Sequence, residues 1–200
     1  MSTPRLIRCA DVAAQPWRNG GGITRELLTW PPGPDWRLRL SVADIQTDGP
    51  FSRFEGVQRW CVVLDGAGVE LQIAGQPQHL TPASAPLRFS GDAPTECRLI
   101  DGPTRDLNLM LRGCAGGLAG VAPHQPWPGS TAPCGVFAAT AGQCQVQGHR
   151  HAVPPMSLLW FDRPPGPLTF AGDGAASTRA WWIWARLDPS THPGSGASSA

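Results

Sequence analysis

The sequence contains no lysine and no tyrosine, so all of its 16 basic residues are arginines. The formal net charge is only +1, which argues against the strongly basic surface that binds nucleic acid or an anionic membrane. No run of about 18 apolar residues is present to span a bilayer. No apolar segment of a secretory signal follows the N-terminus. We therefore expect a cytoplasmic protein with neither nucleic acid nor membrane as a partner.

Several motifs that carry chemistry are also missing. None of the six cysteines forms a C-x-x-C pair, and Cys61 and Cys97 lie within apolar stretches, so we expect reduced, buried thiols. No G-x-S-x-G nucleophile turn occurs. Gly20–Gly22 is not followed by the Gly-Lys-Ser/Thr of a phosphate-binding loop. Nothing in the sequence identifies an activated nucleophile.

Glycine and proline are abundant, with 24 and 22 residues, and they separate apolar stretches that make up a chain with 41% hydrophobic residues. No stretch has the period of a helix of about a dozen residues. Short alternating segments instead recur at the spacing of about 8–12 residues that is typical of an all-β sandwich or barrel. We predict an all-β protein.

The glycine run Gly20–Gly22 comes directly before a predicted strand over residues 23–30. Such a run is tolerated in a turn, or where a ligand or another strand passes close to the backbone. Alternation places Arg25 on the same face as Ile23 and Leu27. A charge on an apolar face needs a partner, so Arg25 has either an internal carboxylate or an anionic ligand.

The predicted strand over residues 105–112 has two different faces. Its leucines share one face, whereas Asp106, Asn108 and Met110 share the other. This strand is either half solvated or, in a closed barrel, turns its polar face to the lumen. In the second case Asp106 is the expected partner of Arg25.

The loop over residues 48–56 and the pair of histidines further along the chain each have two interpretations. In the loop, Asp48 and Ser52 either bond to nearby backbone amides or line a pocket with Arg25. His149 and His151 alternate on a strand, so both can point at one metal ion. A third ligand is missing nearby, which favours a solvated hairpin.

Several blocks between residues 16 and 112 together resemble the HutD/Ves family. The blocks are Trp17-Arg18-Asn19-Gly20-Gly21-Gly22 with Thr24-Arg25-Glu26, Ser41-Val42-Ala43, Asp48-Gly49-Pro50-Phe51-Ser52, Leu64-Asp65-Gly66-Ala67-Gly68, Phe89-Ser90-Gly91-Asp92 and Arg105-Asp106-Leu107-Asn108-Leu109-Met110. The resemblance implies a bicupin with two small cupin-like β-barrels. It also implies a bacterial protein linked to histidine utilisation or to stress, with a small carboxylate in the first barrel.

Cupin metal sites take two histidines and a glutamate just before a V-L-x-G strand, and this chain has Ser52, Phe54 and Arg59 there, with no histidine. The resemblance therefore implies a metal-free site without a cofactor. We assign residues 1–113 to the N-terminal barrel with the pocket and residues 114–133 to a connector. A smaller C-terminal half then covers residues 134–187, and residues 188–200 form a disordered tail.

The leading hypothesis is a sensor or regulator of histidine catabolism or stress that binds a small carboxylate, and a homodimer is possible. Arg25 would hold the anion through two parallel hydrogen bonds, and the glycine backbone would add N–H donors. An alternative is a lyase or isomerase that uses Asp48 or Asp106 as its base. A third hypothesis is an interaction module whose pocket is filled by side chains. The predicted ligand-binding residues are Trp17, Asn19, Gly20, Gly21, Gly22, Thr24, Arg25, Ser41, Asp48, Phe51, Ser52, Asp106, Asn108 and Met110.

Overall fold

The computed structural model describes residues 3–122, 125–127, 133–164, 166–174 and 178–186. Within these ranges the chain is built from antiparallel β-strands in four sheets, with one short 3-10 turn and no α-helix. The all-β prediction is confirmed. The predicted tail over 188–200 lies outside the described residues.

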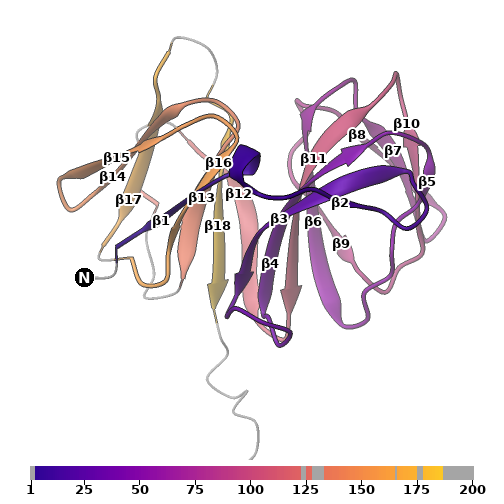
Figure 1. Cartoon of the computed structure of the whole chain (residues 1–200), viewed down its shortest axis with the longest axis horizontal. Coiled ribbons are helices and arrows are strands. Elements are labelled where there is room, and N and C mark those ends of the chain that lie inside the picture. The colour runs from indigo at the N-terminus through magenta and orange to yellow at the C-terminus, as the bar shows by residue number, and fades with distance from the viewer. Residues whose placement is uncertain (1–2, 123–124, 128–132, 165, 175–177, 187–200) are drawn as a thin grey trace, which may run out of the picture.

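Two sheets make up the N-terminal half (Figure 1). The six-stranded sheet has the order β2 (Gln15–Pro16), β3 (Gly22–Trp30), β4 (Leu38–Ile45), β11 (Thr104–Arg112), β6 (Val57–Asp65) and β9 (Leu87–Ser90). The four-stranded sheet has the order β5 (Gly49–Pro50), β10 (Thr95–Leu99), β7 (Val69–Ile73) and β8 (Gln76–Leu80). The sheets face each other rather than forming one closed barrel.

The C-terminal half repeats this plan with fewer strands. Its larger sheet has the order β1 (Arg5–Arg8), β16 (Ser157–Phe161), β13 (Cys134–Ala138), β18 (Ala180–Arg186) and β12 (Ala115–Gly120). Its smaller sheet has the order β15 (His149–Val153), β14 (Gly142–Val146) and β17 (Leu168–Gly172), and the 3-10 turn η1 (Cys9–Asp11) follows β1.

Two strands pair outside the segments to which the sequence assigned them. β1, placed with the N-terminal barrel, pairs with β16 of the C-terminal half. β12 lies in the predicted connector and pairs with β18 along its whole length. The C-terminal half therefore takes a strand from the start of the chain and another from the connector.

Strand alternation creates three separate apolar cores. One lies between the two N-terminal sheets and includes Cys61, Val63 and Leu71. A second lies within the C-terminal half. The third and largest contains buried residues of both halves, such as Leu109 and Phe137, and so joins the six-stranded sheet to the five-stranded sheet. Both of these inner sheets are covered on two sides.

β18 illustrates this double coverage. The strand is apolar on both faces, and both faces are largely buried. Trp181 and Ile183 belong to the core between the halves, whereas Trp182 belongs to the core of the C-terminal half. These tryptophans are therefore packed in the interior.

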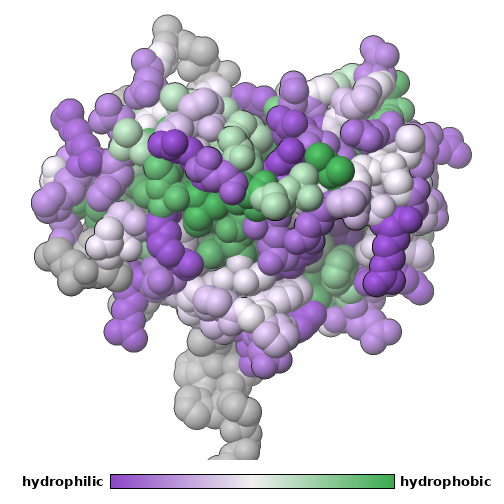
Figure 2. All heavy atoms as spheres, in the orientation of Figure 1, coloured by the Kyte–Doolittle hydropathy of each residue, from purple (hydrophilic) through white to green (hydrophobic). Residues whose placement is uncertain are grey.

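The outer surface is less uniform than the interior. On the face shown in Figure 2 hydrophilic residues predominate, and apolar residues gather near the middle. Among the described residues the exposed large hydrophobic side chains are Leu6 and Ile100. No helix in the described part of the chain is long and apolar enough to cross a membrane.

Candidate functional site

A pocket of about 760 Å³ opens on the face of the six-stranded sheet that points toward the four-stranded sheet. Alternation along β4 and β11 supplies its floor, because every second side chain of these strands points away from the core between the halves. The β2–β3 connection and the segment after β5 supply its walls. The lining residues are Gln15, Pro16, Trp17, Arg18, Asn19, Thr24, Arg39, Ser41, Ala43, Pro50, Phe51, Ser52, Phe54, Arg59, Asp106, Asn108 and Met110.

Arg59 is the buried cation of this pocket, with 5% of its surface exposed. Three aromatic rings surround its guanidinium carbon, whose distances to the ring centroids are 5.2 Å for Phe51, 5.7 Å for Phe54 and 4.9 Å for Phe89. Its Nη1 donates to the carbonyl oxygen of Ser52 at 3.3 Å. Its Nε is buried without a hydrogen-bond partner among the described residues.

Asp106 is the buried carboxyl group of the same pocket and is fully enclosed. It accepts a hydrogen bond from Asn108 Nδ2 at 2.7 Å and from the Cys61 thiol at 3.4 Å. Asn108 Oδ1 in turn accepts from Arg59 Nη2 at 3.4 Å. Burial raises the pKa of Asp106 to about 6. The amide of Asn108 thus bridges the cation and the acid, which make no direct salt bridge.

Burial also changes the pKa values of the two groups beside this acid. It lowers the pKa of Arg59 and raises the pKa of the Cys61 thiol well above its usual value. Cys61 is therefore a neutral donor to Asp106 and not a reactive thiolate. The chemistry of the pocket rests on a guanidinium, a carboxyl group that changes its charge near pH 6, and an amide.

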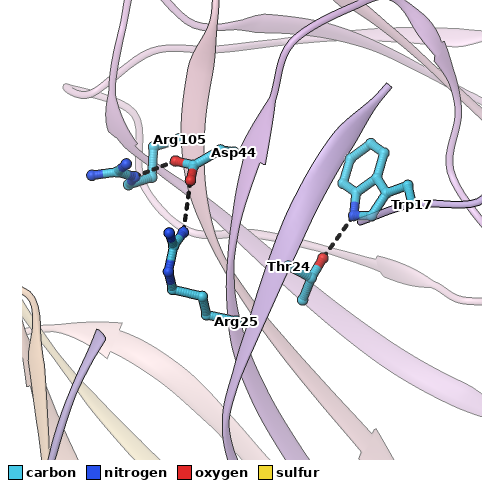
Figure 3. A network of polar contacts seen from close by, with 5 residues as sticks. All are labelled: Trp17, Thr24, Arg25, Asp44 and Arg105. Carbon is cyan, nitrogen blue, oxygen red and sulfur yellow. Dashed lines mark hydrogen bonds and ion pairs between the residues drawn. The ribbon is translucent and has the colours of Figure 1, made fainter. Parts of the chain in front are cut away.

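Arg25 does not line the pocket, so its predicted place in the barrel interior was wrong. Its Nη1 donates to Asp44 Oδ2 at 2.8 Å, and Asp44 Oδ1 accepts from Arg105. Figure 3 shows this cluster on one side of β3, with Trp17 and Thr24 on the other side. Because Val42, the partner of Arg25 across β3 and β4, belongs to the core between the halves, Arg25 faces that interface.

The expected pairing of Arg25 with Asp106 is likewise wrong, since the partner is Asp44. The internal-carboxylate alternative for Arg25 is the one that the structure contains. A register shift between Glu26 and Leu28 also changes the alternation of β3, so Leu27 and Leu28 are both buried. Arg25 does lie on an apolar face, as predicted, but this face packs against the C-terminal half instead of lining the pocket.

The glycines form a tight turn beside the pocket and do not line it. Gly20 has a φ of 71°, and its N–H donates to the Trp17 carbonyl oxygen at 3.0 Å. The Gly21 N–H donates to Asn19 Oδ1 at 3.1 Å. A Cβ at Gly22 would collide with the Asp44 carbonyl oxygen. The run therefore allows close backbone packing, and its N–H groups are not gathered as an anion nest at the pocket.

The remaining predicted residues divide clearly. Asp48 is outside the pocket and accepts a hydrogen bond at 2.8 Å from the N–H of Leu99, a residue distant in the sequence, so neither of its two predicted roles is the one observed. Trp17 lies at the wall, where its Nε1 donates to Thr24 Oγ1 at 2.7 Å. The predicted residues that do line the pocket are Trp17, Asn19, Thr24, Ser41, Phe51, Ser52, Asp106, Asn108 and Met110.

The sequence missed the pocket's arginines, Arg18, Arg39 and Arg59, as binding candidates. Arg59 begins a stretch that looks apolar on both faces, so its charge did not stand out. A signal was nevertheless present. Arg59 alternates with Cys61, and Arg39 alternates with Ser41, so each arginine shares a face with a residue that points into this half.

Among the residues that the structure describes, none completes a metal centre with the histidine pair. His149 is exposed on β15, and His151 is half-buried with its ring in a T-shaped contact with that of Phe161. No group of three or more His, Cys, Asp or Glu side chains in the described part of the chain is placed to hold a metal ion.

Comparison with known families shows which family the chain belongs to. The HutD family model matches residues 9–178, which includes the pocket and all strands of both halves except β1 and β18. The chain belongs to the HutD family. Two curated relatives of this HutD-family chain are partial matches. A 21.2 kDa protein from the hutC 3′ region of Pseudomonas putida is 43% identical over 115 residues, and protein Ves of Cronobacter sakazakii is 38% identical over 106 residues.

These matches cover 55% and 51% of this chain and 59% of each relative, so the chain spans less than two thirds of their length. Solved structures extend the likeness across the fold. HutD from Pseudomonas fluorescens SBW25 is 31% identical, covers 92% of this chain and all (100%) of its own, and superposes with a TM-score of 0.78. An oxalate decarboxylase from Bacillus subtilis has a TM-score of 0.65 at 9% identity, which supports the cupin fold alone.

Proposed function

We propose that the N-terminal pocket binds a small carboxylate and that Arg59, rather than Arg25, is its anchor. The observation that carries this proposal is a buried guanidinium without a carboxylate partner. Arg59 takes no part in the salt bridges among the described residues, which are made by Arg5, Arg25, Arg39 and Arg105. Its Nε also has no hydrogen-bond partner there. Burying an unpaired charge is expensive, so the site favours an occupant of opposite charge.

The chemistry of the groups supports an acid as that occupant. A guanidinium presents N–H donors in a planar fork that matches the two oxygens of a carboxylate. The rings of Phe51, Phe54 and Phe89 lie around the Arg59 guanidinium, and its Nε keeps an N–H without a hydrogen-bond partner among the described residues. Ser41 and Asn108 are further polar groups of the lining, where they can orient the ligand.

We propose that binding serves regulation or sensing in histidine catabolism or stress. The family and the relatives named HutD and Ves support this context. The P. fluorescens HutD structure is described as a formate condition, and formate is a small carboxylate. In this proposal the acid reports the state of the catabolic route to a partner.

Asp106 supports one alternative, an enzyme of the lyase or isomerase type. A buried carboxyl group with a pKa near 6 in a pocket is suited to general acid–base catalysis near neutral pH. The two functions differ in one measurement. The protein is incubated with an acid that it binds, and the proton NMR spectrum of the acid is followed for hours. Signals of a product would show turnover, and an unchanged spectrum supports a sensor.

Replacing Arg59 with Gln is expected to weaken binding of formate, acetate and urocanate by at least about 30-fold, because truncating one partner of a buried, hydrogen-bonded charge pair costs roughly 2–5 kcal/mol. Isothermal titration measures this loss. Arg25→Gln is the matched control, since it removes the same charge from the opposite face of the six-stranded sheet and should leave the affinity within about twofold of wild type. Equal affinities for wild type and Arg59→Gln would contradict the proposal, as would a loss confined to Arg25→Gln.

A further inference from the structure

Strand β6 contains an irregularity directly opposite the buried acid of the pocket. Arg105 of β11 pairs with Asp65 of β6. The next residue, Asp106, pairs with Val63, so Leu64 has no partner on β11. An extra residue of this kind is a β-bulge, and bulges are frequent next to active sites, where they redirect a side chain. Asp106 is the first residue after the bulge, so its placement depends on how the bulge is held.

The bulge lies where β6 has a neighbouring strand on one side only. β9 pairs with Gln58–Cys61, and no strand among the described residues pairs with Val63 or Leu64 on that edge. Both residues are buried. A buried carbonyl group without a partner is costly, so the carbonyl oxygens on this edge need donors from elsewhere in the molecule.

Arg179 of the C-terminal half supplies these donors. Its Nη1 donates to the Leu64 carbonyl oxygen at 2.7 Å, and its Nη2 donates to the Val63 carbonyl oxygen at 2.9 Å. Arg179 lies just before β18, where its N–H donates to Thr140 Oγ1 at 3.2 Å and its carbonyl oxygen accepts from the Ala139 N–H at 2.8 Å. A planar guanidinium presents its donors in a fixed geometry, so Arg179 holds the two carbonyl groups in one arrangement.

The guanidinium of Arg179 is committed to this contact. Arg179 makes none of the salt bridges found among the described residues. Its guanidinium carbon lies 5.9 Å from the centroid of the Trp181 ring, which belongs to the core between the halves. Hydrogen bonds from a charged donor are stronger than neutral ones. The contact is therefore a specific link from one half of the chain to the bulge of the other.

The pocket side of β6 shows what the bulge positions. The Cys61 thiol donates to Asp106 at 3.4 Å across two adjacent strands, so this contact depends on the register between β6 and β11. Arg59 of β6 and Cys97 of β10 also act on the charge of Asp106, and Arg39 of β4 lines the same pocket. Because β6 carries two of these groups, a shift of β6 would change the surroundings of Asp106.

We infer that Arg179 is a positioning residue that the C-terminal half supplies to the N-terminal pocket, where it holds the β6 bulge and so keeps Asp106 enclosed beside Cys61 and Asn108. The pocket is then built by both halves of the chain rather than by the N-terminal half alone. This role goes beyond the proposed function, because it does not depend on whether an acid occupies the pocket.

A pH titration of Asp106 tests this role, followed by ¹³C NMR of the side-chain carboxyl groups in protein labelled at aspartate. The signal of Asp106 is identified by its absence in Asp106→Asn. Arg179→Gln removes the guanidinium, so water should reach the carboxyl group, and the pKa of Asp106 should fall by about one unit from its value of about 6. The side-chain NH₂ signals of Asn108 should shift too, since this group donates to Asp106.

Phe137→Leu is the matched control. It weakens the core between the halves and leaves the Arg179 hydrogen bonds in place, so the pKa of Asp106 and the Asn108 signals should match wild type. Arg179→Lys keeps the charge and its N–H donors but loses the planar guanidinium. It should give a smaller shift in the same direction, and it replaces Arg179→Gln if that variant does not fold.

An Asp106 pKa and Asn108 signals that match wild type in the Arg179 variant would overturn the inference and leave carboxylate binding by Arg59 intact. Changes of the same size in Phe137→Leu would overturn it too, because any loosening between the halves would then have the same effect.

Discussion

Asp106→Asn is expected to increase the free energy of unfolding, measured relative to wild type, as pH rises from acidic to neutral. Burial raises the pKa of Asp106 from 3.8 to about 6, so between these values the folded state holds a proton that the unfolded state releases. The stability from this group is complete below about pH 4 and is lost as pH rises through 6. The shift corresponds to roughly 3 kcal/mol. The variant, which stays neutral, lacks that loss.

Urea unfolding of both proteins at pH 4, 5, 6 and 7 measures the effect. The unfolding free energy of the variant relative to wild type should rise by roughly 3 kcal/mol over this range. Asp44→Asn is the control with the opposite sign. Desolvation opposes ionisation of Asp44, but the hydrogen bonds from Arg105 and Arg25 outweigh it and lower its pKa. Its stabilisation is therefore lost as pH falls. Parallel pH profiles of stability for wild type and Asp106→Asn would show that folding does not raise the pKa of Asp106.

Phe137→Ala is expected to destabilise both halves together. Phe137 is fully buried in the core that joins the two inner sheets, with its ring centroid 6.4 Å from that of Trp181. Truncating a buried phenylalanine costs roughly 3–5 kcal/mol, through lost contacts and the cavity that remains. Because β4 and β11 contribute to the same core, their stability should fall with that of β13.

Native-state hydrogen exchange reports this coupling strand by strand. Exchange of the β4 and β11 amides should accelerate by the same factor as exchange in β13. Leu6→Ala is a suitable control, because Leu6 is 41% exposed on the edge strand β1 and should change stability by less than about 0.5 kcal/mol. Faster exchange confined to the C-terminal half would show that the halves unfold independently.

The strands were predictable from the sequence because their side chains alternate, and β11 shows how far this extends. Asp106, Asn108 and Met110 were predicted to share a polar face, and all three line the pocket. The identity of each face was harder to obtain. The six-stranded sheet is covered on both sides, so alternation alone does not distinguish the pocket face from the face that meets the other half.

Arg25 and Arg59 show the consequence. Arg25 lies on an apolar face, as predicted, but this face meets the other half, where Asp44 neutralises it. Arg59 lies in a strand that looks apolar throughout, so a charge in the interior was overlooked. The pairing of β1 with β16 was equally inaccessible, because it joins residues about 150 positions apart and depends on the packing of the whole chain.

A crystal soaked in acetate tests the central claim, that a buried guanidinium in the N-terminal half holds a small carboxylate. We expect density for the acid in the pocket beside Arg59 and Asn108, with its oxygens within hydrogen-bond distance of the Arg59 guanidinium and the Arg25–Asp44 pair unchanged. Acetate bound at Arg25 on the opposite face of β3, or a pocket that contains only water at saturating acetate, would contradict the account.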